Sequence, residues 1–356
     1  MMKKLGLVSL VLVLMAGLIF GGCTKGTETE SPTGEESPGP SVEEPIELSM
    51  VIFLPDMPPG NSWSHMFMDK VESISNGDIT IDLIGGPEAI PASDQPAAVK
   101  RGTVDIANSM YNYAEALAPG VECLGRAEYT PAELRENGTV EYVQELFAES
   151  GVHYLGNSSP SEPHQQTAVY LGKGNKIEKV EDFQGLKIAA TGGANAPFFE
   201  ALGASCLPIP FGEYFTAMER GTADGYNVGV PGIQDYGLEP VTGYMLDELI
   251  ASGAAAFLVN MDTWNSLSKD DQEVLTQAAI ETEIDGIDVF EELVAEVKSD
   301  ISDDGVEIIK LPPEESVEFF ETYRQAMWAE DMEEYPEVTA ELKEMATNPD
   351  FSRLQE

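Results

Sequence analysis

Residues that bind transition metals or form disulfides are scarce in this chain of 356 residues. It contains three cysteines and three histidines, and no C-x-x-C or H-E-x-x-H motif brings them into the spacing of a metal site. We therefore expect no metal. The spacing of Cys123 and Cys206 leaves open either a disulfide or two buried free thiols, and we favour the thiols.

Positive charge is the second shortage. Lysine and arginine together number 19 against 63 aspartates and glutamates, which gives a formal net charge of −44 at pH 7. Binding of nucleic acid needs a basic surface that neutralises phosphates, so this balance excludes nucleic acid as a partner. A strongly acidic surface suits a soluble protein outside the membrane, including one from a salty habitat.

Signals of catalysis are also missing. The serines include no G-x-S-x-G nucleophile elbow, and three histidines offer few general bases. The G-G-x-N run at 192–195 is not the G-x-G-x-x-G of a dinucleotide site, so no cofactor is expected. We interpret this run as a turn; alternatively, its backbone N–H groups meet a ligand oxygen where the helix after Asn195 begins.

Long apolar runs are absent except near the N-terminus. Residues 5–20 are apolar, follow Met-Met-Lys-Lys and precede the sequence Gly-Gly-Cys that ends at Cys23. This arrangement predicts a signal peptide over 1–22 and lipidation of Cys23. The alternative is a transmembrane anchor, for which the run is short of the roughly 20 residues required. Residues 23–45 are polar and rich in Ser, Thr, Glu and Pro, which predicts a disordered, lipid-bearing tether.

The remaining residues predict two lobes that each mix strands and helices. Strand and helix patterns alternate from Ile46 to Ser109, which predicts a βαβαβ unit with a parallel sheet and helices on its faces. A further apolar strand at 254–260 is expected to return to the first lobe. The expected division places 46–160 and about 255–285 in the first lobe, and 161–254 and about 286–356 in the second.

Two long helices are expected. The capping signature Ser-Lys-Asp-Asp that begins at Ser268 starts a helix that runs without proline to about residue 302. Apolar residues at helical spacing, among them Leu134 and Phe147, predict one amphipathic helix over 131–150.

The most informative stretch of the chain is 180–229. Its alternating strands and helices are, in chain order, a strand at 185–190, a helix at 195–202, a strand at 206–210, a helix at 213–220 and a strand that opens at Asp224. In parallel sheets of this kind, ligands lie beyond the carboxyl ends of the strands. We therefore expect the loops after these strands to share one edge.

Three motifs within this stretch resemble a known family. D-x-x-G-L-K-I begins at Asp182, F-x-x-A-L-G-A at Phe199, and P-x-P-F-G-E-Y-x-x-A-x-x-x-G-x-x-D-G at Pro208. In this order and spacing they resemble the solute-binding proteins of TRAP transporters, of the dicarboxylate-binding DctP type. The resemblance extends more faintly from about residue 47 to 306. It implies an α/β, bilobed, periplasmic-binding-protein-like fold, with a ligand cleft between two βα lobes and a long helix that spans both.

The resemblance implies a receptor and not an enzyme. Such a protein lies outside the cytoplasm, here held to the membrane through a lipid anchor. It captures a small organic solute, either an organic acid or an aromatic or amphipathic compound, and delivers it to the permease subunits of a TRAP-type transporter. Two alternatives stay open: an exported hydrolase or isomerase that uses Glu213 with a tyrosine, and a ligand-binding partner of a membrane sensor.

The candidate ligand-binding residues lie at expected strand ends, in nearby loops and in the expected crossover between the lobes. They are Trp63, His65, Tyr111, Tyr113, Arg126, His164, Gln165, Ala189, Asn195, Glu213, Tyr214, Tyr226 and Asn227. The resemblance implies an arginine directly after G-L-K-I, where this chain has Ala189. A buried carboxylate then needs another cation, for which Arg101, Arg126, Lys173 and Lys187 are candidates, with Arg126 the first choice. Otherwise the solute is less charged and is held among the tyrosines, which we favour.

Overall fold

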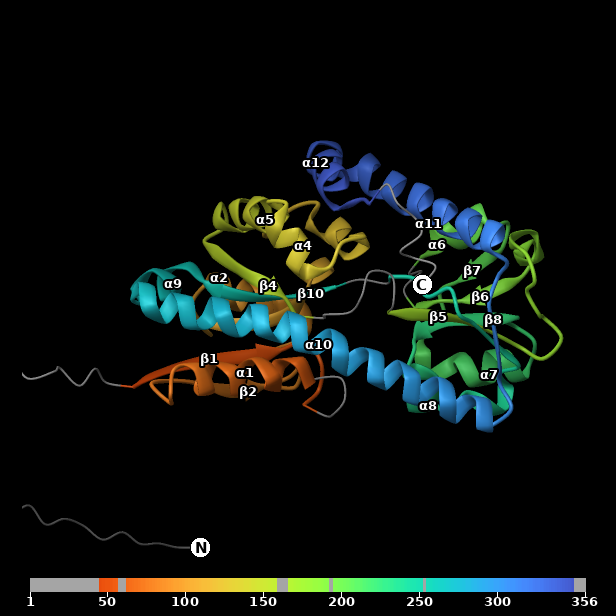
Figure 1. Ribbon diagram of the computed structural model, residues 1–356, viewed down its shortest axis with the longest axis horizontal. Helices are drawn as coiled ribbons and strands as arrows, with labels where there is room; N and C mark the ends of the chain where they lie inside the picture. Colours follow the sequence, from red (N-terminus) through yellow and green to blue (C-terminus); the bar gives the residue numbers. More distant parts are fainter. Residues whose placement is uncertain (1–44, 57–61, 159–165, 192–194, 252–253, 349–356) are drawn as a thin grey trace, which may run out of the picture. The chain divides into compact units, whose positions relative to one another are not determined.

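The computed structural model of the chain describes residues 45–56, 62–158, 166–191, 195–251 and 254–348. Their strands form two mixed β-sheets, one of five strands and one of six (Figure 1). The signal peptide, Cys23 and almost all of the tether expected from the sequence lie outside the described residues. Among the described residues, no helix is both long enough and apolar enough to span a membrane.

The first sheet confirms the βαβαβ unit expected from the sequence. Its strand order is β2-β1-β3-β10-β4, with β1 parallel to both β2 and β3, and β10 antiparallel to β3 and β4. Its strands are β1 Ile46–Ile52, β2 Ile79–Gly85, β3 Ile106–Met110, β4 Val152–Asn157 and β10 Ala255–Asn260. Strand β10 is buried throughout, because its side chains alternate between the hydrophobic clusters on the two faces of the sheet.

The second sheet contains the stretch that carries the family motifs. Its order is β11-β9-β5-β8-β6-β7, with β6 parallel to β7 and β8, and β5 antiparallel to β8 and β9. Its strands are β5 Thr167–Leu171, β6 Lys187–Ala189, β7 Ser205–Leu207, β8 Gly225–Gly229, β9 Tyr244–Leu246 and β11 Glu307–Ile309.

Helices cover both faces of each sheet. Besides α4, α5, α10 and α11, whose bounds follow below, the α-helices are α1 Ser62–Ile74, α2 Gln95–Lys100, α3 Tyr111–Ala114, α6 Ala196–Ala201, α7 Tyr214–Glu219, α8 Gly232–Asp235, α9 Met261–Ser266 and α12 Pro336–Ala346. Helix α1 packs with Phe67 and Val71 in one cluster of the first sheet, and α6 packs with Phe198 and Phe199 in one cluster of the second.

The long helix expected after Ser268 is confirmed as α10, Lys269–Asp303. Ser268 closes a capping box with Asp271. The helix serves both sheets: Leu275 lies in a cluster of the first sheet, and Phe290 lies in a cluster of the second (Figure 1). A strip of apolar residues on one side of a single helix thus joins two hydrophobic cores.

A second helix, α11 Pro313–Glu334, also contributes to both sheets, which the sequence did not suggest. Phe319 lies in a cluster of the second sheet, whereas Trp328 lies with Val51 and Ala107 in a cluster of the first. Leu342 of α12 belongs to that same first-sheet cluster. Residues 286–356, expected in the second lobe, therefore supply side chains to the cores of both sheets.

The single helix expected over 131–150 is wrong. The structure has two helices there, α4 Pro131–Glu136 and α5 Thr139–Ala148. The helical conformation is interrupted at Asn137 and Gly138. Gly138 has a φ of 88°, which a glycine adopts without the strain that a Cβ would cause.

The two cysteines of the folded part are free thiols in different hydrophobic clusters. Cys123 is buried in a cluster of the first sheet, and Cys206 packs against a cluster of the second. This arrangement agrees with the free thiols that we favoured from the sequence.

Candidate functional site

A chain of side-chain hydrogen bonds lies at the carboxyl end of strand β8. The amide nitrogen of Asn227 donates to Thr167 Oγ1 at 3.2 Å and to the main-chain oxygen of Ala168 at 3.0 Å. The side-chain oxygen of Asn227 accepts from Asn195 Nδ2 at 3.1 Å. All of these groups are buried, so the sheet holds the two amides in fixed orientations.

The backbone conformation at position 195 explains why an asparagine occurs there. It is the residue before α6 and has a φ of 59°, in the left-handed region that asparagine tolerates better than most residues. Asn195 is the last residue of the G-G-x-N run, and the turn interpreted there stays a prediction. Residues 192–194 lie outside the described residues, so the alternative of a ligand at their backbone N–H groups stays a prediction.

Ala189 lies under a group of tyrosines, at the position where the family resemblance implied an arginine. It is fully buried in the cluster that also contains Tyr170, Tyr214 and Tyr226. The rings of Tyr170 and Tyr226 stack with centroids 5.0 Å apart, and Tyr214 lies 5.6 Å from Tyr226. The methyl group of Ala189 therefore faces an aromatic, uncharged environment.

The hydroxyl groups of these tyrosines have partners within the protein. Tyr170 donates to the main-chain oxygen of Val230, Tyr214 donates to that of Asn227, and Tyr226 shares a hydrogen bond with Thr242. Burial raises the pKa of all three hydroxyls, so they remain protonated at neutral pH. They are therefore structural groups and not bases, which removes support for an enzyme that pairs a tyrosine with Glu213.

A second polar cluster lies at the end of the first sheet. Asn108 of β3 donates from its amide nitrogen to Ser64 Oγ at 2.6 Å, and its oxygen accepts from Ser158 Oγ at 2.5 Å. All three side chains are buried. Polar groups at this depth are expensive unless hydrogen-bonded, and here each has a partner.

Two connections between the sheets bring these polar clusters close together. Ser158 N donates to the main-chain oxygen of Ala255, and Thr167 N donates to that of Ile250. Ala255 is only five residues after Ile250, so the two positions are at most about 18 Å apart. Both clusters therefore lie beside the same short segment of chain that connects the sheets.

Trp63 joins the two lobes directly. It belongs to α1 of the first lobe, yet its ring packs against the second-sheet cluster of Tyr214 and Tyr226 and lies 6.1 Å from the ring of Phe290. Its indole N–H is buried and has no hydrogen-bond partner in the part of the chain that the structure describes. A buried donor without a partner is uncommon in folded proteins, so this atom is a candidate for contact with a ligand.

Two of the cations proposed for a bound carboxylate already lie beside polar groups of the protein, so their contact with a ligand stays a prediction. Arg126 Nη1 lies 2.8 Å from Asp331 Oδ2 on α11. Lys187 Nζ donates to the main-chain oxygen of Gly221 at 2.8 Å and lies 3.6 Å from Asp224. Burial raises the pKa of Asp331 to about 6, although Arg126 opposes this shift.

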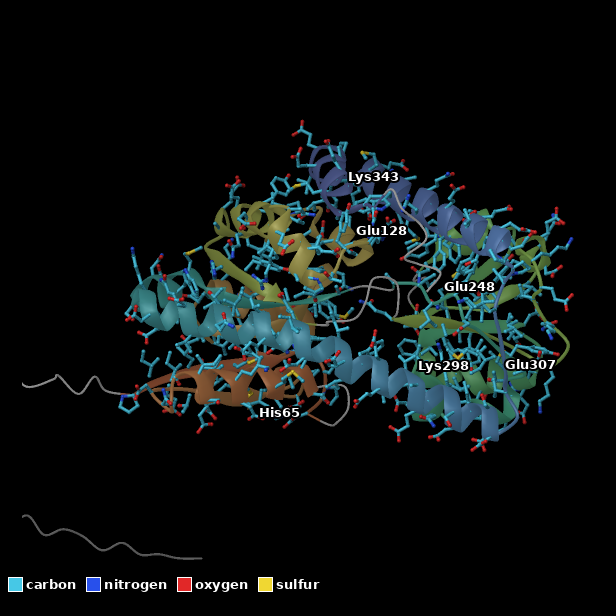
Figure 2. The ribbon with its side chains drawn as sticks, in the orientation of Figure 1. His65, Glu128, Glu248, Lys298, Glu307 and Lys343 are labelled. Atoms are coloured by element: carbon cyan, nitrogen blue, oxygen red, sulfur yellow. The ribbon has the colours of Figure 1, made fainter. Side chains whose placement is uncertain are left out.

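Ion pairs between distant segments occupy further basic side chains. Figure 2 labels Glu128, Lys298 and Glu307, which pair with Arg324, Asp247 and Lys176 respectively. The pairs of Glu128 and Lys298 are mostly buried, whereas that of Glu307 is exposed.

Arg135 and Glu283 form another ion pair, with two hydrogen bonds between the side chains. Arg135 Nε and Nη2 donate to the two oxygens of Glu283 at 2.7 and 2.8 Å, and Nη2 also donates to the main-chain oxygen of Leu155. Asn157 N donates to Glu283 at 2.7 Å. Glu283 therefore fixes helix α10 to the end of β4, just before the chain leaves the first lobe.

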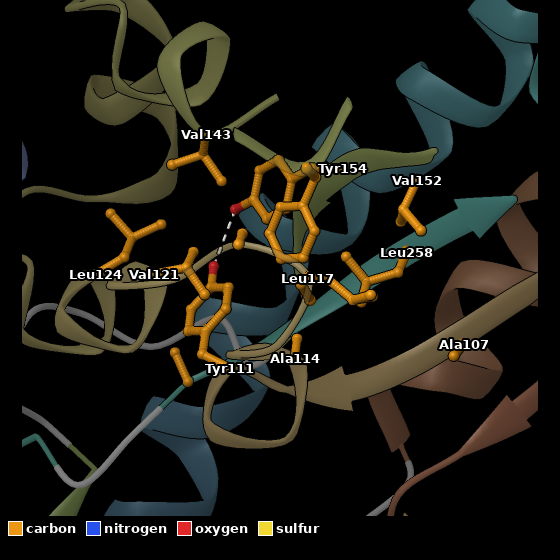
Figure 3. Close-up of a cluster of buried hydrophobic side chains, with 14 of the residues drawn as sticks. Ala107, Tyr111, Ala114, Leu117, Val121, Leu124, Val143, Val152, Tyr154 and Leu258 are labelled. Atoms are coloured by element: carbon orange, nitrogen blue, oxygen red, sulfur yellow. Dashed lines mark hydrogen bonds between the residues drawn. The ribbon is translucent and has the colours of Figure 1, made fainter. Parts of the chain in front are cut away.

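Tyr111 is placed away from the expected edge. It is fully buried in a core cluster of the first sheet, and its hydroxyl shares a 3.0 Å hydrogen bond with that of Tyr154 (Figure 3). Apolar side chains such as Leu124 and Val143 surround the pair. This environment gives no support to a ligand contact of Tyr111.

The remaining candidates divide between exposed and undescribed positions. Tyr113 and Glu213 are exposed, and no ion pair of Glu213 occurs among the described residues. His65 Nε2 lies 2.8 Å from Asp56 Oδ1 at the start of α1. His164 and Gln165 lie outside the described residues and stay predictions.

Sequence reasoning missed four members of the two polar clusters, namely Ser64, Asn108, Ser158 and Thr167. Asn108 carried a usable signal, because it is an amide in the middle of a buried strand. The others are serines and a threonine whose partners come from other elements, so no local pattern marks them. Among the described residues, no group of three His, Cys, Asp or Glu side chains is placed to hold a metal ion.

Comparison with known proteins agrees with the fold. Residues 55–334 match the family DctP, described as "Bacterial extracellular solute-binding protein, family 7". The chain is 26% identical over 251 residues to a monocarboxylate 2-oxoacid-binding periplasmic protein of Nostoc sp., which covers 67% of each chain. It is 23% identical over 213 residues to the ectoine-binding periplasmic protein TeaA of Halomonas elongata, covering 57% of this chain and 61% of TeaA.

Solved structures share the architecture. A TRAP periplasmic solute-binding protein from Rhodobacter sphaeroides, in an apo open structure, matches with a TM-score of 0.72 and 20% identity over 87% of this chain and 98% of that one. Apo TeaA matches with a TM-score of 0.73 and 22% identity, over 87% and 99% respectively. Since the family match extends over most of the chain, this protein belongs to the DctP family of bacterial extracellular solute-binding proteins.

Proposed function

We propose that the protein is the extracytoplasmic solute receptor of a TRAP-type transporter, which captures a small organic solute between its two lobes and delivers it to membrane permease subunits. The observation that carries this proposal is the pair of buried polar clusters, one on each sheet, at the two ends of short connections between the sheets. The family supports the same role, and the names of relatives include 2-oxoacid and ectoine binding, both small organic solutes.

Closure of the lobes follows from this arrangement. Each sheet has its own core clusters, and the long helices α10 and α11 connect them, so the two lobes can rotate about a hinge while each keeps its core. A solute that bonds to both clusters would favour the closed state by the difference in its affinity for the two states.

We also propose that lipidated Cys23 and the acidic tether hold the receptor at the membrane surface. This part of the proposal rests on the sequence, since these residues lie outside those that the structure describes. A single lipidated cysteine with more than one acyl chain gives stable anchoring.

Small-angle X-ray scattering tests the proposal. The purified protein is measured as isolated, after removal of bound solute by unfolding, dialysis and refolding, and after the removed fraction is added back. We expect a larger radius of gyration in the solute-free protein and compaction on addition. An unchanged radius in all three samples, or chemical conversion of the solute during incubation, would contradict the proposed receptor.

A further inference from the structure

We propose that the solute carries an ammonium, amidinium or other N–H donor group and no net negative charge. This inference rests on the proposed function and narrows its solute class. It depends on which polar atoms the two clusters leave open, and on the state of the basic side chains.

The orientation of Asn227 determines what Asn195 can offer. Asn227 Nδ2 donates to the main-chain oxygen of Ala168, which can only accept, so the nitrogen and oxygen of this amide are assigned without ambiguity. Its oxygen must then face Asn195 Nδ2. The remaining polar atom of Asn195 is its side-chain oxygen, which receives no hydrogen bond from the described residues. An open acceptor at the end of β6 calls for a donor on the solute.

The first lobe offers a hydrogen-bond donor at Trp63, whereas Asn195 of the second lobe offers an acceptor. The buried indole N–H of Trp63 can only donate, and it has no partner among the described residues. Trp63 packs against the cluster of Tyr226 and Val228, the two residues that flank Asn227. A solute with a donor at one end and an uncharged or shared acceptor at the other satisfies both groups.

The basic side chains do not provide for an anion. Five described lysines and arginines with side chains less than one third exposed lie beside a carboxylate of the protein; they are Lys70, Arg126, Arg135, Lys298 and Arg324. Ala189 removes the cation that the family resemblance implied. A buried anion that carries no positive group of its own would remain without a counter-charge, which is unfavourable.

The net charge of the whole protein also disfavours an anionic solute. A formal net charge of −44 attracts cations to the surface and repels acids during approach. The shared chemistry of the solute is therefore a positive or N–H-bearing nitrogen, whether in a zwitterion or in a simple organic cation.

Isothermal titration calorimetry with defined probes tests this inference. The probes are ectoine as a zwitterion with N–H donors, putrescine as an organic cation, and pyruvate and succinate as acids. We expect at least one nitrogenous probe to bind at least tenfold more tightly than both acids. Ectoine alone would indicate a zwitterion, and putrescine alone a cation.

Two variants probe the groups that carry the argument. Asn195→Gly removes the open acceptor and keeps a residue that tolerates the positive φ, so it should weaken the nitrogenous probe about tenfold. Trp63→Phe keeps an aromatic ring and removes the donor, with a loss of similar size. The matched control is Asn76→Gly, since Asn76 is the other described non-glycine residue with positive φ, at 54°, and should leave all affinities unchanged.

The outcomes separate this inference from the proposed function. Tighter binding of pyruvate or succinate, or a nitrogen-free acid released from the purified protein on denaturation, would overturn the inference and leave the receptor intact. Equal affinities of wild type and Asn195→Gly would also overturn it. Binding of no probe together with release of no solute would overturn both.

Discussion

Replacement of Glu283 by glutamine tests how strongly the crossover end of β4 is fixed to helix α10. The substitution keeps the shape of the side chain but leaves Arg135, whose side chain is only 17% exposed, without its counter-charge. Burial raises the pKa of Glu283, and its hydrogen bond with Arg135 opposes that shift, which shows that the arginine stabilises the charged form. Removal of one partner from a buried ion pair lowers the free energy of unfolding by about 3–5 kcal/mol. Because glutamine can keep some of the hydrogen bonds, we expect Glu283→Gln to lose about 3 kcal/mol.

Urea unfolding followed by circular dichroism measures this loss. With slopes of about 2–3 kcal/mol per molar urea, the midpoint should fall by roughly 1 M. Asp285→Asn is the matched control, because Asp285 lies on the same helix and pairs with Lys70 at 2.5 Å but is 56% exposed. This control should lose less than about 1 kcal/mol. Equal losses in the two variants would refute the argument that burial makes the Arg135–Glu283 pair decisive.

Three further predictions concern a backbone position, a titration and the anchor. Gly156→Ala should destabilise the protein, because a Cβ would overlap Arg135 and lie 2.5 Å from Glu283 Oε1; a normal melting temperature would contradict the close approach. The pKa of Asp331 is raised to about 6 in the folded state, so its contribution to the free energy of unfolding is present near pH 4 and is lost as the pH rises through about 6. Asp331→Asn should therefore flatten the pH dependence of the melting temperature in that window. An unchanged slope would contradict this assignment. Cys23→Ser should release the protein from the membrane fraction of cells, and undiminished membrane association would refute lipid anchoring.

Local patterns predicted the regular elements because the physics that forms them is local. The capping box at Ser268 and a long stretch without proline give α10, and the apolar run of β10 reflects burial on both faces of a sheet. The family motifs from Asp182 to Asp224 likewise lie on β6, α6, β7 and α7 as expected. The break at Asn137 and Gly138 was visible as a turn signal, but the apolar periodicity around it outweighed that signal.

Contacts between distant residues could not be predicted in the same way. Arg126 was the first choice as a ligand partner, and only the structure shows that α11 places Asp331 beside it, more than 200 residues further along the chain. Tyr111 follows a strand end, as a ligand contact would, yet Tyr154 draws its hydroxyl into the core. Which side-chain atom of Asn195 remains open depends on the orientation of the Asn227 amide, and strand β5 sets that orientation through the main-chain oxygen of Ala168. Such assignments need tertiary structure, because the partner decides the role.

Native mass spectrometry of the protein as purified tests the receptor most directly. The account predicts that the purified protein is heavier than its polypeptide by the mass of one small organic molecule. This extra mass should be lost after unfolding and refolding, and it should return when the released fraction is added back. It also predicts that the released molecule is chemically unchanged. A protein that carries no such molecule and takes up none from the released fraction would contradict the account.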